Sequence, residues 1–362
     1  MMDYSAMVKE SVASQEGYPL EAPSCRIKMD ANESPFEPSE SFRDRVAQIA
    51  RELSLNRYPA PGSPGLKRSF ARSLGVPEDM VLTGNGSDEL IQVLLSALEV
   101  VPGRGIMVPV PTFVMYGIIA RNNGHRVIEV PLNRRFDLDR AAMLKTIDEE
   151  RPQAIFLAWP NNPTGNCFDA AIIEDILQAT REESIVVVDE AYGAYAEESF
   201  LPRVKEFSNL VILRTLSKIG MAALRTGVLV GQPDLIRQLE KVCLPYNINL
   251  FSQVVAERFL EQEADQTLQR AVLIKNERQR LADEMRRLKG IEPFPSEANF
   301  ILFRCTLEKN GVYRHLLEKG ILIKNFTSTG PLADCMRVTV GTEEENSAFI
   351  DALKEAVLKQ GA

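Results

Sequence analysis

Lys218 lies in a sequence context that could make its side-chain amine nucleophilic. It lies in the stretch 213–225, which follows an apolar run and then breaks into small and hydroxylated residues. Its neighbours Leu216, Ile219 and Met221 are apolar, so burial would lower the pKa of its ammonium group and make the amine nucleophilic. A lysine that bonds covalently to a carbonyl carbon needs this environment. The alternative is a strand-end lysine whose long side chain reaches water.

A carboxylate and an amide follow two other apolar runs. Asp189 ends the run 185–189, and Asn162 lies in the loop 161–165, shortly after the run 153–158. If both runs are strands of an open α/β sheet, their carboxyl ends border the ligand crevice. The acidic strand end also suits a nucleotide hydrolase, but the chain has no Gly-x-x-x-x-Gly-Lys-Ser/Thr loop. A structural aspartate is the other alternative.

A glycine turn, Gly84-Asn85-Gly86-Ser87-Asp88-Glu89, predicts an anion site. It precedes a helical stretch, so the backbone N–H groups of Gly86, Ser87 and Asp88 would lie at a helix N-terminus. The turn matches the first half of a dinucleotide fingerprint, but Glu89 occupies the third glycine position. A plain capped helix is the alternative. Arg225, shortly after the lysine, could add a cation for a phosphate.

Composition favours a soluble enzyme with small-molecule substrates. The chain of 362 residues is 45% hydrophobic and 25% charged, and its net charge of −8 does not suit a nucleic-acid surface. Five scattered cysteines without a Cys-x-x-Cys pair favour the cytoplasm. No apolar run reaches membrane-span length, and the N-terminus lacks a signal-peptide pattern. His125 and His315 lack metal-ligand spacing, so no metal site is predicted.

Apolar runs alternate with helical stretches. This alternation predicts an α/β fold with a mostly parallel central sheet covered by helices on both faces. No helix separates the last two runs, so one strand should run against the others. Ser63 predicts a helix cap before Pro64, and Gly75 should close that helix. The predicted strands are 105–110, 125–130, 153–158, 184–188, 210–213 and 226–230, and the predicted helices are 39–54, 87–99, 112–122, 138–150 and 169–182.

The chain divides into three predicted parts. Residues 1–35 form an arm that joins a small domain, residues 36–260 form a large α/β domain, and residues 261–362 form the small α+β domain. A long helical region at about 233–288 connects the two domains. A capping box at Thr342 should begin the last helix. The small domain is expected to hold strands near 298–304, 321–324 and 335–340 and a helix near 308–319.

Together these groups meet the needs of pyridoxal phosphate. Its aldehyde requires a lysine amine, and its ring nitrogen requires a carboxylate. Its phenolic oxygen needs hydrogen-bond donors, and its phosphate needs amides, hydroxyls and an arginine. Lys218, Asp189, Asn162 and Arg225, with the glycine turn, supply one group for each need.

On these residues the chain resembles the fold-type I, pyridoxal-phosphate-dependent aminotransferases of class I and II, and most closely their histidinol-phosphate branch. The implied reaction is transamination between L-histidinol phosphate and 2-oxoglutarate, giving imidazole acetol phosphate and glutamate in histidine biosynthesis. An aromatic-amino-acid aminotransferase, a threonine-phosphate decarboxylase and, remotely, a nucleotide-binding module are the alternatives. The matching motifs are Asn32-Glu33-Ser34-Pro35, Asn56-Arg57-Tyr58-Pro59, Gly84-Asn85-Gly86-Ser87-Asp88-Glu89, Asn161-Asn162-Pro163-Thr164-Gly165, Asp189-Glu190-Ala191-Tyr192, Thr215-Leu216-Ser217-Lys218 and Arg337-Val338-Thr339-Val340-Gly341.

The resemblance implies a role for each site residue. Lys218 bonds to the cofactor aldehyde and moves the substrate proton, while Asp189 pairs with the ring nitrogen. Asn162 and Tyr192 bind the ring oxygen, and Phe113 stacks on the ring. The residues implied to hold the cofactor phosphate are Gly86, Ser87, Asp88, Thr215, Ser217 and Arg225. The residues implied to bind substrate are Arg337, Lys324, Tyr18, Tyr116 and Asn162.

The resemblance also implies a homodimer, because Tyr58 would reach the cofactor phosphate of the neighbouring subunit. Two positions depart from the family pattern. Arg225 follows Lys218 by seven residues, one fewer than expected, so the loop between them must be tighter. Lys324 stands where a second anion-binding arginine is expected, and its ammonium lacks the fork geometry of a guanidinium.

Overall fold

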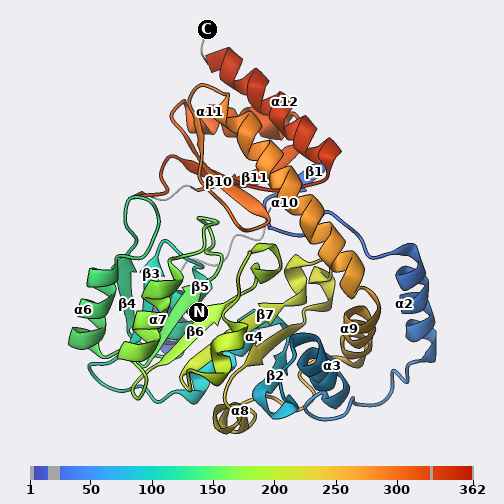
Figure 1. Cartoon of the computed structure of the whole chain (residues 1–362), viewed down its shortest axis with the longest axis vertical. Coiled ribbons are helices and arrows are strands. Elements are labelled where there is room, and N and C mark those ends of the chain that lie inside the picture. The colour runs from blue at the N-terminus through green and yellow to red at the C-terminus, as the bar shows by residue number, and fades with distance from the viewer. Residues whose placement is uncertain (1–3, 15–24, 327–328, 361–362) are drawn as a thin grey trace.

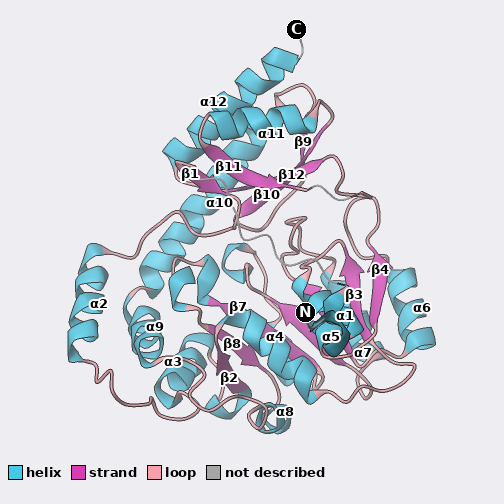
Figure 2. Cartoon of the chain, turned by 180° about the vertical axis from the view of Figure 1, so that it is seen from behind, coloured by secondary structure: helices cyan, strands magenta, loops and turns pink. Residues whose placement is uncertain are grey.

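Two sheets organise the chain. The computed structural model describes residues 4–14, 25–326 and 329–360. A seven-stranded sheet lies in the lower part of Figure 1 and a five-stranded sheet in the upper part. Figure 2 shows both sheets in magenta from behind, with helices packed around them. The predicted α/β class with a smaller α+β unit is confirmed.

The seven-stranded sheet is parallel except at one strand. Its order is β2-β8-β7-β6-β5-β3-β4, and β8 pairs antiparallel with both of its neighbours. The expected reversed strand is therefore β8, which follows β7 without an intervening α-helix. The strands are β2 (Val81–Gly84), β3 (Ile106–Val110), β4 (Val127–Pro131), β5 (Ala154–Ala158), β6 (Ile185–Asp189), β7 (Leu210–Thr215) and β8 (Gly227–Val230).

Helices cover both faces of this sheet because successive strand residues point to opposite sides. Along β5, Ile155 and Leu157 belong to one apolar cluster, with α2, α3, α6, α7 and α9. Phe156 belongs to the opposite cluster, with α4, α5 and α8. The helices are α2 (Glu40–Glu52), α3 (Pro64–Leu74), α4 (Gly86–Ala97), α5 (Met115–Asn122), α6 (Arg140–Glu150), α7 (Ala170–Ala179), α8 (Pro233–Leu239) and α9 (Leu250–Gln262).

The five-stranded sheet joins a strand of the N-terminal arm to strands from the last part of the chain. Its order is β1-β11-β12-β10-β9, and β1 pairs parallel with β11, Ile27 opposite Ile321. The arm thus supplies a strand that the sequence pattern did not predict. The elements of this unit are β1 (Ile27–Met29), α10 (Ala264–Arg286), β9 (Ile291–Pro293), β10 (Phe300–Cys305), α11 (Lys309–Glu318), β11 (Ile321–Asn325), β12 (Cys335–Thr339) and α12 (Glu343–Gln360). The short helix α1 (Glu10–Ala13) instead contacts α5 of the large unit (Figure 2).

One local prediction was too coarse and another was wrong. The helical region predicted at 233–288 is three separate helices, with α8 ending at Leu239 and α9 beginning at Leu250, and of the three only α10 runs from one unit to the other (Figure 1). Ser63 lies at the N-cap of α3, but its φ of 47° is left-handed and its side chain makes no capping hydrogen bond. The start of α3 instead rests on Pro64, whose fixed φ suits the first helical turn.

Other helix ends formed as predicted. Gly75 ends α3 with a φ of 67°, a conformation that favours glycine. Before α12, the backbone N–H of Thr342 donates to Glu345 Oε2 at 2.9 Å, and the Glu345 N–H donates to Thr342 Oγ1 at 3.3 Å. This is the reciprocal pair of a capping box. Among the residues described, no helix is long and apolar enough to cross a membrane.

Candidate active site

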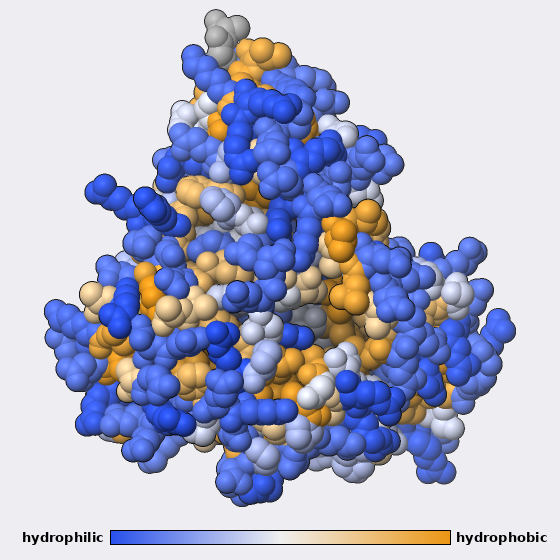
Figure 3. Space-filling view, viewed as in Figure 1, coloured by the Kyte–Doolittle hydropathy of each residue, from blue (hydrophilic) through white to orange (hydrophobic). Residues whose placement is uncertain are grey.

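A cavity of about 850 Å³ lies between the two sheets, within the size range of small-molecule sites. The carboxyl ends of β3, β5, β6 and β7 meet at one edge of the large sheet, and β11 and β12 face them from the small sheet. Figure 3 shows apolar surface at this junction between outer surfaces that are mostly hydrophilic. The predicted site residues that line the cavity are Ser87, Asp88, Phe113, Tyr116, Asn162, Asp189, Tyr192, Thr215, Ser217, Lys218, Arg225, Lys324 and Arg337.

The side chain of Lys218 is largely buried, and the residue lies in the 3₁₀ turn that follows β7. Burial first, and the nearby Arg337 second, lower the pKa of Lys218 to about 8. Its Nζ donates to the carbonyl of Ala31 at 3.2 Å and lies 5.8 Å from the centre of the Tyr192 ring. The Tyr195 hydroxyl donates to the Lys218 carbonyl at 2.6 Å and fixes the backbone. The burial predicted for this lysine is therefore present.

Asp189 is the last residue of β6 and is 4% exposed. Its Oδ2 accepts a hydrogen bond from the Tyr116 hydroxyl at 2.7 Å, and its Oδ1 accepts one from the Ala191 N–H at 3.0 Å. Burial raises the pKa of Asp189 to about 6, although these two hydrogen bonds oppose the rise. Tyr116 was predicted to bind substrate, but its hydroxyl points to this carboxylate instead. Phe113 meets the Tyr116 ring edge-on at 5.4 Å.

A cradle for an anion forms where α4 begins. Gly86 opens the helix with a φ of 77°, and a Cβ there would lie 2.9 Å from Arg225 Nη2. Arg225 donates to Ser217 Oγ at 3.1 Å and to Asp88 Oδ2 at 3.3 Å. Thr215 Oγ1 donates to Ser217 Oγ at 2.9 Å. Helix N-terminal amides, two hydroxyls and a guanidinium thus converge, which is the donor set that a phosphate needs.

The short loop between Lys218 and Arg225 closes by a left-handed turn. Residues Ala222–Leu224 form one 3₁₀ turn, and Arg225 follows with a φ of 49°. This conformation reverses the chain at once into β8, whose first residue is Gly227. The predicted tightening is therefore present, and Arg225 reaches Ser217 despite the missing residue.

Arg337 links three parts of the site. Its Nη1 donates to Asn162 Oδ1, its Nη2 donates to the Asp30 carbonyl at 2.7 Å, and its Cζ lies 5.1 Å from the centre of the Phe300 ring. Lys324 on β11 stands opposite Arg337 in the β11–β12 register. Two cations therefore face the cavity from adjacent strands.

Asn32 is a site residue that sequence reasoning missed. Its Nδ2 donates to the Tyr192 hydroxyl at 2.9 Å, and its φ of 56° places it in the left-handed region. Its N–H donates to Thr339 Oγ1 at 3.0 Å, and its carbonyl accepts from Asn299 Nδ2 at 3.0 Å. The arm thereby orients Tyr192. The motif at 32–35 was noted in the sequence, but nothing in it pointed to this contact.

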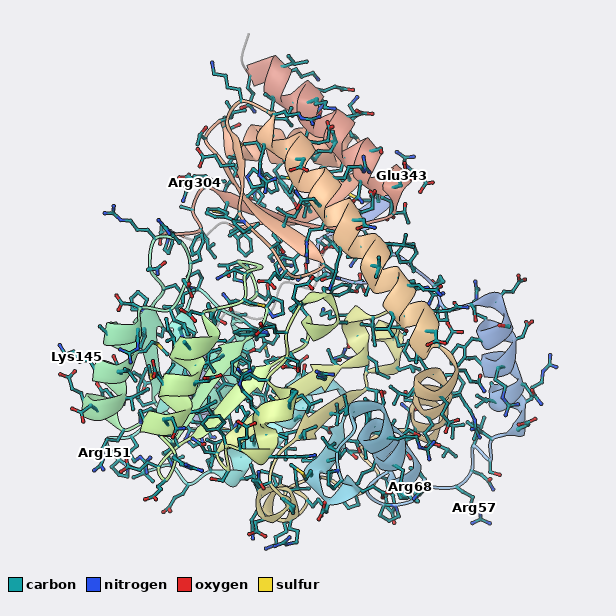
Figure 4. All side chains as sticks on the ribbon, viewed as in Figure 1. Arg57, Arg68, Lys145, Arg151, Arg304 and Glu343 are labelled. Carbon is teal, nitrogen blue, oxygen red and sulfur yellow. The ribbon has the colours of Figure 1, made fainter. Side chains whose placement is uncertain are left out.

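Of the predicted site residues that the structure describes, Gly86 and Tyr58 do not line the cavity of this chain. Tyr58 is 81% exposed, stacks on Tyr246 at 4.7 Å and does not line the cavity. Figure 4 labels its neighbour Arg57 at the outer edge of the molecule, on the loop between α2 and α3. Tyr18 lies outside the described residues.

The family of this chain follows from its similarity to known proteins. The model of the family "Aminotransferase class I and II" matches residues 26–353. The chain belongs to this family. Histidinol-phosphate aminotransferase 2 of Nitrosococcus oceani is 46% identical over 331 residues, which cover 91% of each chain. Histidinol-phosphate aminotransferase of Aquifex aeolicus is 38% identical over 354 residues, which cover 97% of this chain and 98% of the relative.

A solved structure supports the same fold for this aminotransferase. The histidinol-phosphate aminotransferase of Sinorhizobium meliloti, solved in complex with pyridoxal-5'-phosphate, aligns with a TM-score of 0.86 at 24% identity and covers 97% of both chains. At this identity the likeness shows the fold alone. The resemblance read from the motifs is therefore confirmed at the level of the family and of the fold.

Gly227 gives a test of the anion cradle in this aminotransferase. A Cβ at Gly227 would lie 2.6 Å from the Gly86 carbonyl carbon and 2.7 Å from the Ser87 amide nitrogen. Because both atoms are backbone, Gly227→Ala must push β8 away from the start of α4. We expect a loss of about 1–3 kcal/mol in the free energy of unfolding and weaker binding of a phosphate-bearing cofactor. Thermal unfolding and equilibrium dialysis measure the two effects.

Gly231, four residues further on, is the matched control. A Cβ there would meet side-chain carbons of Val211 and Leu235 at 3.5 and 3.6 Å, which is ordinary contact. Gly231→Ala should therefore leave cofactor binding unchanged. Equal cofactor affinity in the Gly227 and Gly231 variants would contradict the cradle.

Proposed function

We propose that this aminotransferase uses pyridoxal phosphate to transfer the amino group of L-histidinol phosphate to 2-oxoglutarate, giving imidazole acetol phosphate and glutamate in histidine biosynthesis. The observation that carries the proposal is a buried Lys218 with a pKa of about 8, in one cavity with Asp189 and the anion cradle. The substrate is supported by the names of relatives that are 46% and 38% identical over 91% and 97% of the chain.

The cavity fits the cofactor group by group. Gly86 leaves open the space beside Arg225 that a Cβ would fill, which suits a phosphate oxygen. Asp189 is assigned to the ring nitrogen, and Asn162 and Tyr192 to the ring oxygen. Phe113 is assigned to one ring face. The residues assigned to the phosphate are Gly86, Ser87, Asp88, Thr215, Ser217 and Arg225.

Lys218 is the residue that moves the proton. When bound, pyridoxal phosphate supplies an electron sink that stabilises negative charge at the substrate Cα. Lys218 Nζ is positioned to take the proton from that carbon and return it, because its lowered pKa keeps part of the amine neutral near pH 7 to 8. Asp189 holds the proton on the ring nitrogen when its carboxylate is ionised.

Arg337 and Lys324 are assigned to the substrate anions. Arg337 offers a planar guanidinium suited to a carboxylate or a phosphate, and Lys324 adds a point charge on the next strand. The phosphate of histidinol phosphate and the distal carboxylate of 2-oxoglutarate would use the same two cations in the two half-reactions. Tyr18 stays a predicted substrate residue.

A homodimer completes the proposed site. Four large apolar side chains gather on two neighbouring loops: Leu55 and Tyr58 on one, Leu244 and Tyr246 on the other, with Tyr58 stacked on Tyr246. Tyr58 does not line the cavity of its own chain, so we assign its hydroxyl to the cofactor phosphate of the partner subunit. We also propose the domain limits 1–35 for the arm, 36–260 for the cofactor-binding domain and 261–362 for the small domain.

Purified protein assayed with three amino compounds tests this function. Histidinol phosphate, phenylalanine and threonine phosphate are each supplied, with 2-oxoglutarate as acceptor for the first two. We expect the highest kcat/KM with histidinol phosphate and a yellow protein. Rapid turnover of phenylalanine without turnover of histidinol phosphate would show that the proposed substrate is wrong. A colourless protein that binds ATP or NAD would contradict the whole proposal.

Lys324 gives a prediction about substrate choice. Removing its charge in Lys324→Gln should lower kcat/KM for histidinol phosphate by about tenfold or more, because one charged contact to the phosphate is lost. The loss for 2-oxoglutarate should be smaller, since Arg337 can hold a single carboxylate by a bidentate contact. Steady-state kinetics of both substrates measure the difference.

Arg304→Gln is the matched control for Lys324. Arg304 belongs to the same sheet but pairs with Glu292 at the surface and does not line the cavity. This variant should keep both kcat/KM values. If Lys324→Gln also keeps them, Lys324 does not contact substrate.

A further inference from the structure

Tyr116 is held in place by packing against two aromatic rings. It is fully buried on α5, and its ring stacks on Phe156 with centroids 4.9 Å apart and planes 22° apart. Phe113 closes a second side edge-on, at 5.4 Å and 84°. Its hydroxyl, at the end of the ring, lies 2.7 Å from Asp189 Oδ2. Packing therefore aims the hydroxyl at the carboxylate.

The hydroxyl acts only as a donor to this carboxylate. Burial first, and the adjacent Asp189 second, raise the pKa of Tyr116 well above its ordinary value, so the phenol stays neutral at any working pH. A phenol proton on Oδ2 stabilises the ionised form of Asp189. The Ala191 N–H does the same for Oδ1 at 3.0 Å. Each carboxylate oxygen thus has one donor.

The other charged groups around Asp189 act against its ionisation or come from across the cavity. Asp88 on α4 and Glu190, the next residue in the chain, both raise the pKa of Asp189. Tyr192, a neighbouring phenol, has its own pKa raised by burial. The cations Lys218 and Arg225 line the same cavity. A missing donor at Oδ2 would therefore leave a buried carboxylate oxygen without that hydrogen bond, while Asp88 and Glu190, which pair with Arg225 and Arg214, still oppose its ionisation.

We propose that Tyr116 is a positioning residue that keeps Asp189 ionised and aimed at the ring nitrogen of the cofactor, rather than a residue that binds substrate. The inference rests on the proposed function, because it gives Asp189 its assigned role. Tyr116 acts through its hydroxyl alone, since the ring is held by Phe156 and Phe113. Phenylalanine at this position keeps that packing and removes only the donor.

Tyr116→Phe in the holoenzyme is the test. We expect kcat to fall about 10- to 100-fold, the range of one hydrogen bond to a charged group, while both KM values change less than about threefold. The acid limb of the kcat–pH profile should also move. Catalysis needs the carboxylate form of Asp189, and the variant should raise the pKa of this group. As the pH falls, the variant should therefore lose activity at a pH about one unit higher than the wild-type protein does. A residue that only supports the fold would not move this limb.

Two further variants separate the proposed role from a packing effect. Tyr195→Phe also removes a buried phenol hydroxyl, but that group donates to the neutral Lys218 carbonyl, so its acid limb should stay in place. In an Asp189→Asn background, Tyr116→Phe should lower kcat less than about twofold, because its effect passes through the carboxylate. Equal tenfold losses in both backgrounds would overturn the proposal.

The outcomes also separate this proposal from the proposed function. If the wild-type protein binds pyridoxal phosphate and transaminates, but Tyr116→Phe keeps the wild-type kcat and acid limb, only the role of Tyr116 is overturned. A raised KM at unchanged kcat would make Tyr116 a substrate residue and overturn it as well. If the wild-type protein does not bind the cofactor, the proposed function itself fails.

Discussion

Replacing Lys218 with alanine should lower transamination by about 10⁴-fold, the upper range for a lost general acid–base group, and should abolish the visible absorbance of the lysine-bound cofactor. Within the residues that the structure describes, the Lys218 side chain donates one hydrogen bond, to the Ala31 carbonyl. Its removal should therefore cost little stability. Single-turnover kinetics and the visible spectrum measure the expected losses, and thermal unfolding shows that the fold is kept.

Lys218→Arg is the matched control for charge. A guanidinium keeps the positive charge and much of the volume but stays protonated, so it can neither bond to an aldehyde nor accept a proton. This variant should be as inactive as the alanine variant. Activity within tenfold of the wild-type value in either variant would place the reactive amine on another lysine.

The pH dependence of cofactor binding gives an independent check on the same residue. Only the neutral amine of Lys218 can attack the aldehyde carbon, and its pKa in the cofactor-free protein is about 8. The rate at which cofactor-free protein takes up pyridoxal phosphate should therefore rise with pH and reach half its maximum near pH 8. A half-maximum near the ordinary lysine value would show that the amine is not desolvated.

The sequence predicted the residues at the strand ends well, because strand–helix alternation itself determines where they lie. Asp189 ends β6 and Lys218 follows β7, and the carboxyl ends of neighbouring parallel strands meet at one edge. Asn162 follows β5 by the same rule. Local pattern and topology were sufficient for these three residues.

Contacts between distant parts of the chain could not be predicted in this way. Asn32 reaches Tyr192 because β1 pairs with β11, and that pairing joins residues almost three hundred positions apart, Ile27 with Ile321. The strand is three residues long, so its alternation of buried and exposed residues is too short to stand out in the sequence. The direction of Tyr116 was equally hidden, since a helical pattern shows that a residue is buried but not which polar atom it meets.

The conformation of the loop between Lys218 and Arg225 could not be predicted from its length alone. Counting residues revealed that the loop is one residue short, but several backbone conformations can shorten a loop. The structure uses a left-handed φ of 49° at Arg225 itself, which is uncommon for a side chain of this size. The contact with Ser217 then fixes that choice.

Asp189→Asn should lower kcat by about 10²- to 10³-fold, the usual effect of removing one preorganised charge from an active site. Asparagine keeps the shape of the side chain but cannot carry the negative charge that holds a proton on the ring nitrogen. The KM values should change little. Asp189→Glu, which keeps the charge but lengthens the side chain, should retain more activity. A kcat within tenfold of the wild-type value for Asp189→Asn would remove Asp189 from the chemistry.

The same substitution should make the cofactor-free protein more stable at neutral pH. Folding raises the pKa of Asp189 from 3.8 to about 6, so ionisation is less favourable in the folded state than in the unfolded state. The resulting loss in the free energy of unfolding is absent below pH 3.8 and grows as the pH rises towards 6. Above pH 6 the loss is complete, at about 1–3 kcal/mol. Asp189→Asn should therefore unfold at a higher temperature than the wild-type protein at pH 7, and the gain should vanish near pH 4. A stability cost that disappears when the charge is removed, at the expense of catalysis, is what a buried carboxylate kept for function would produce.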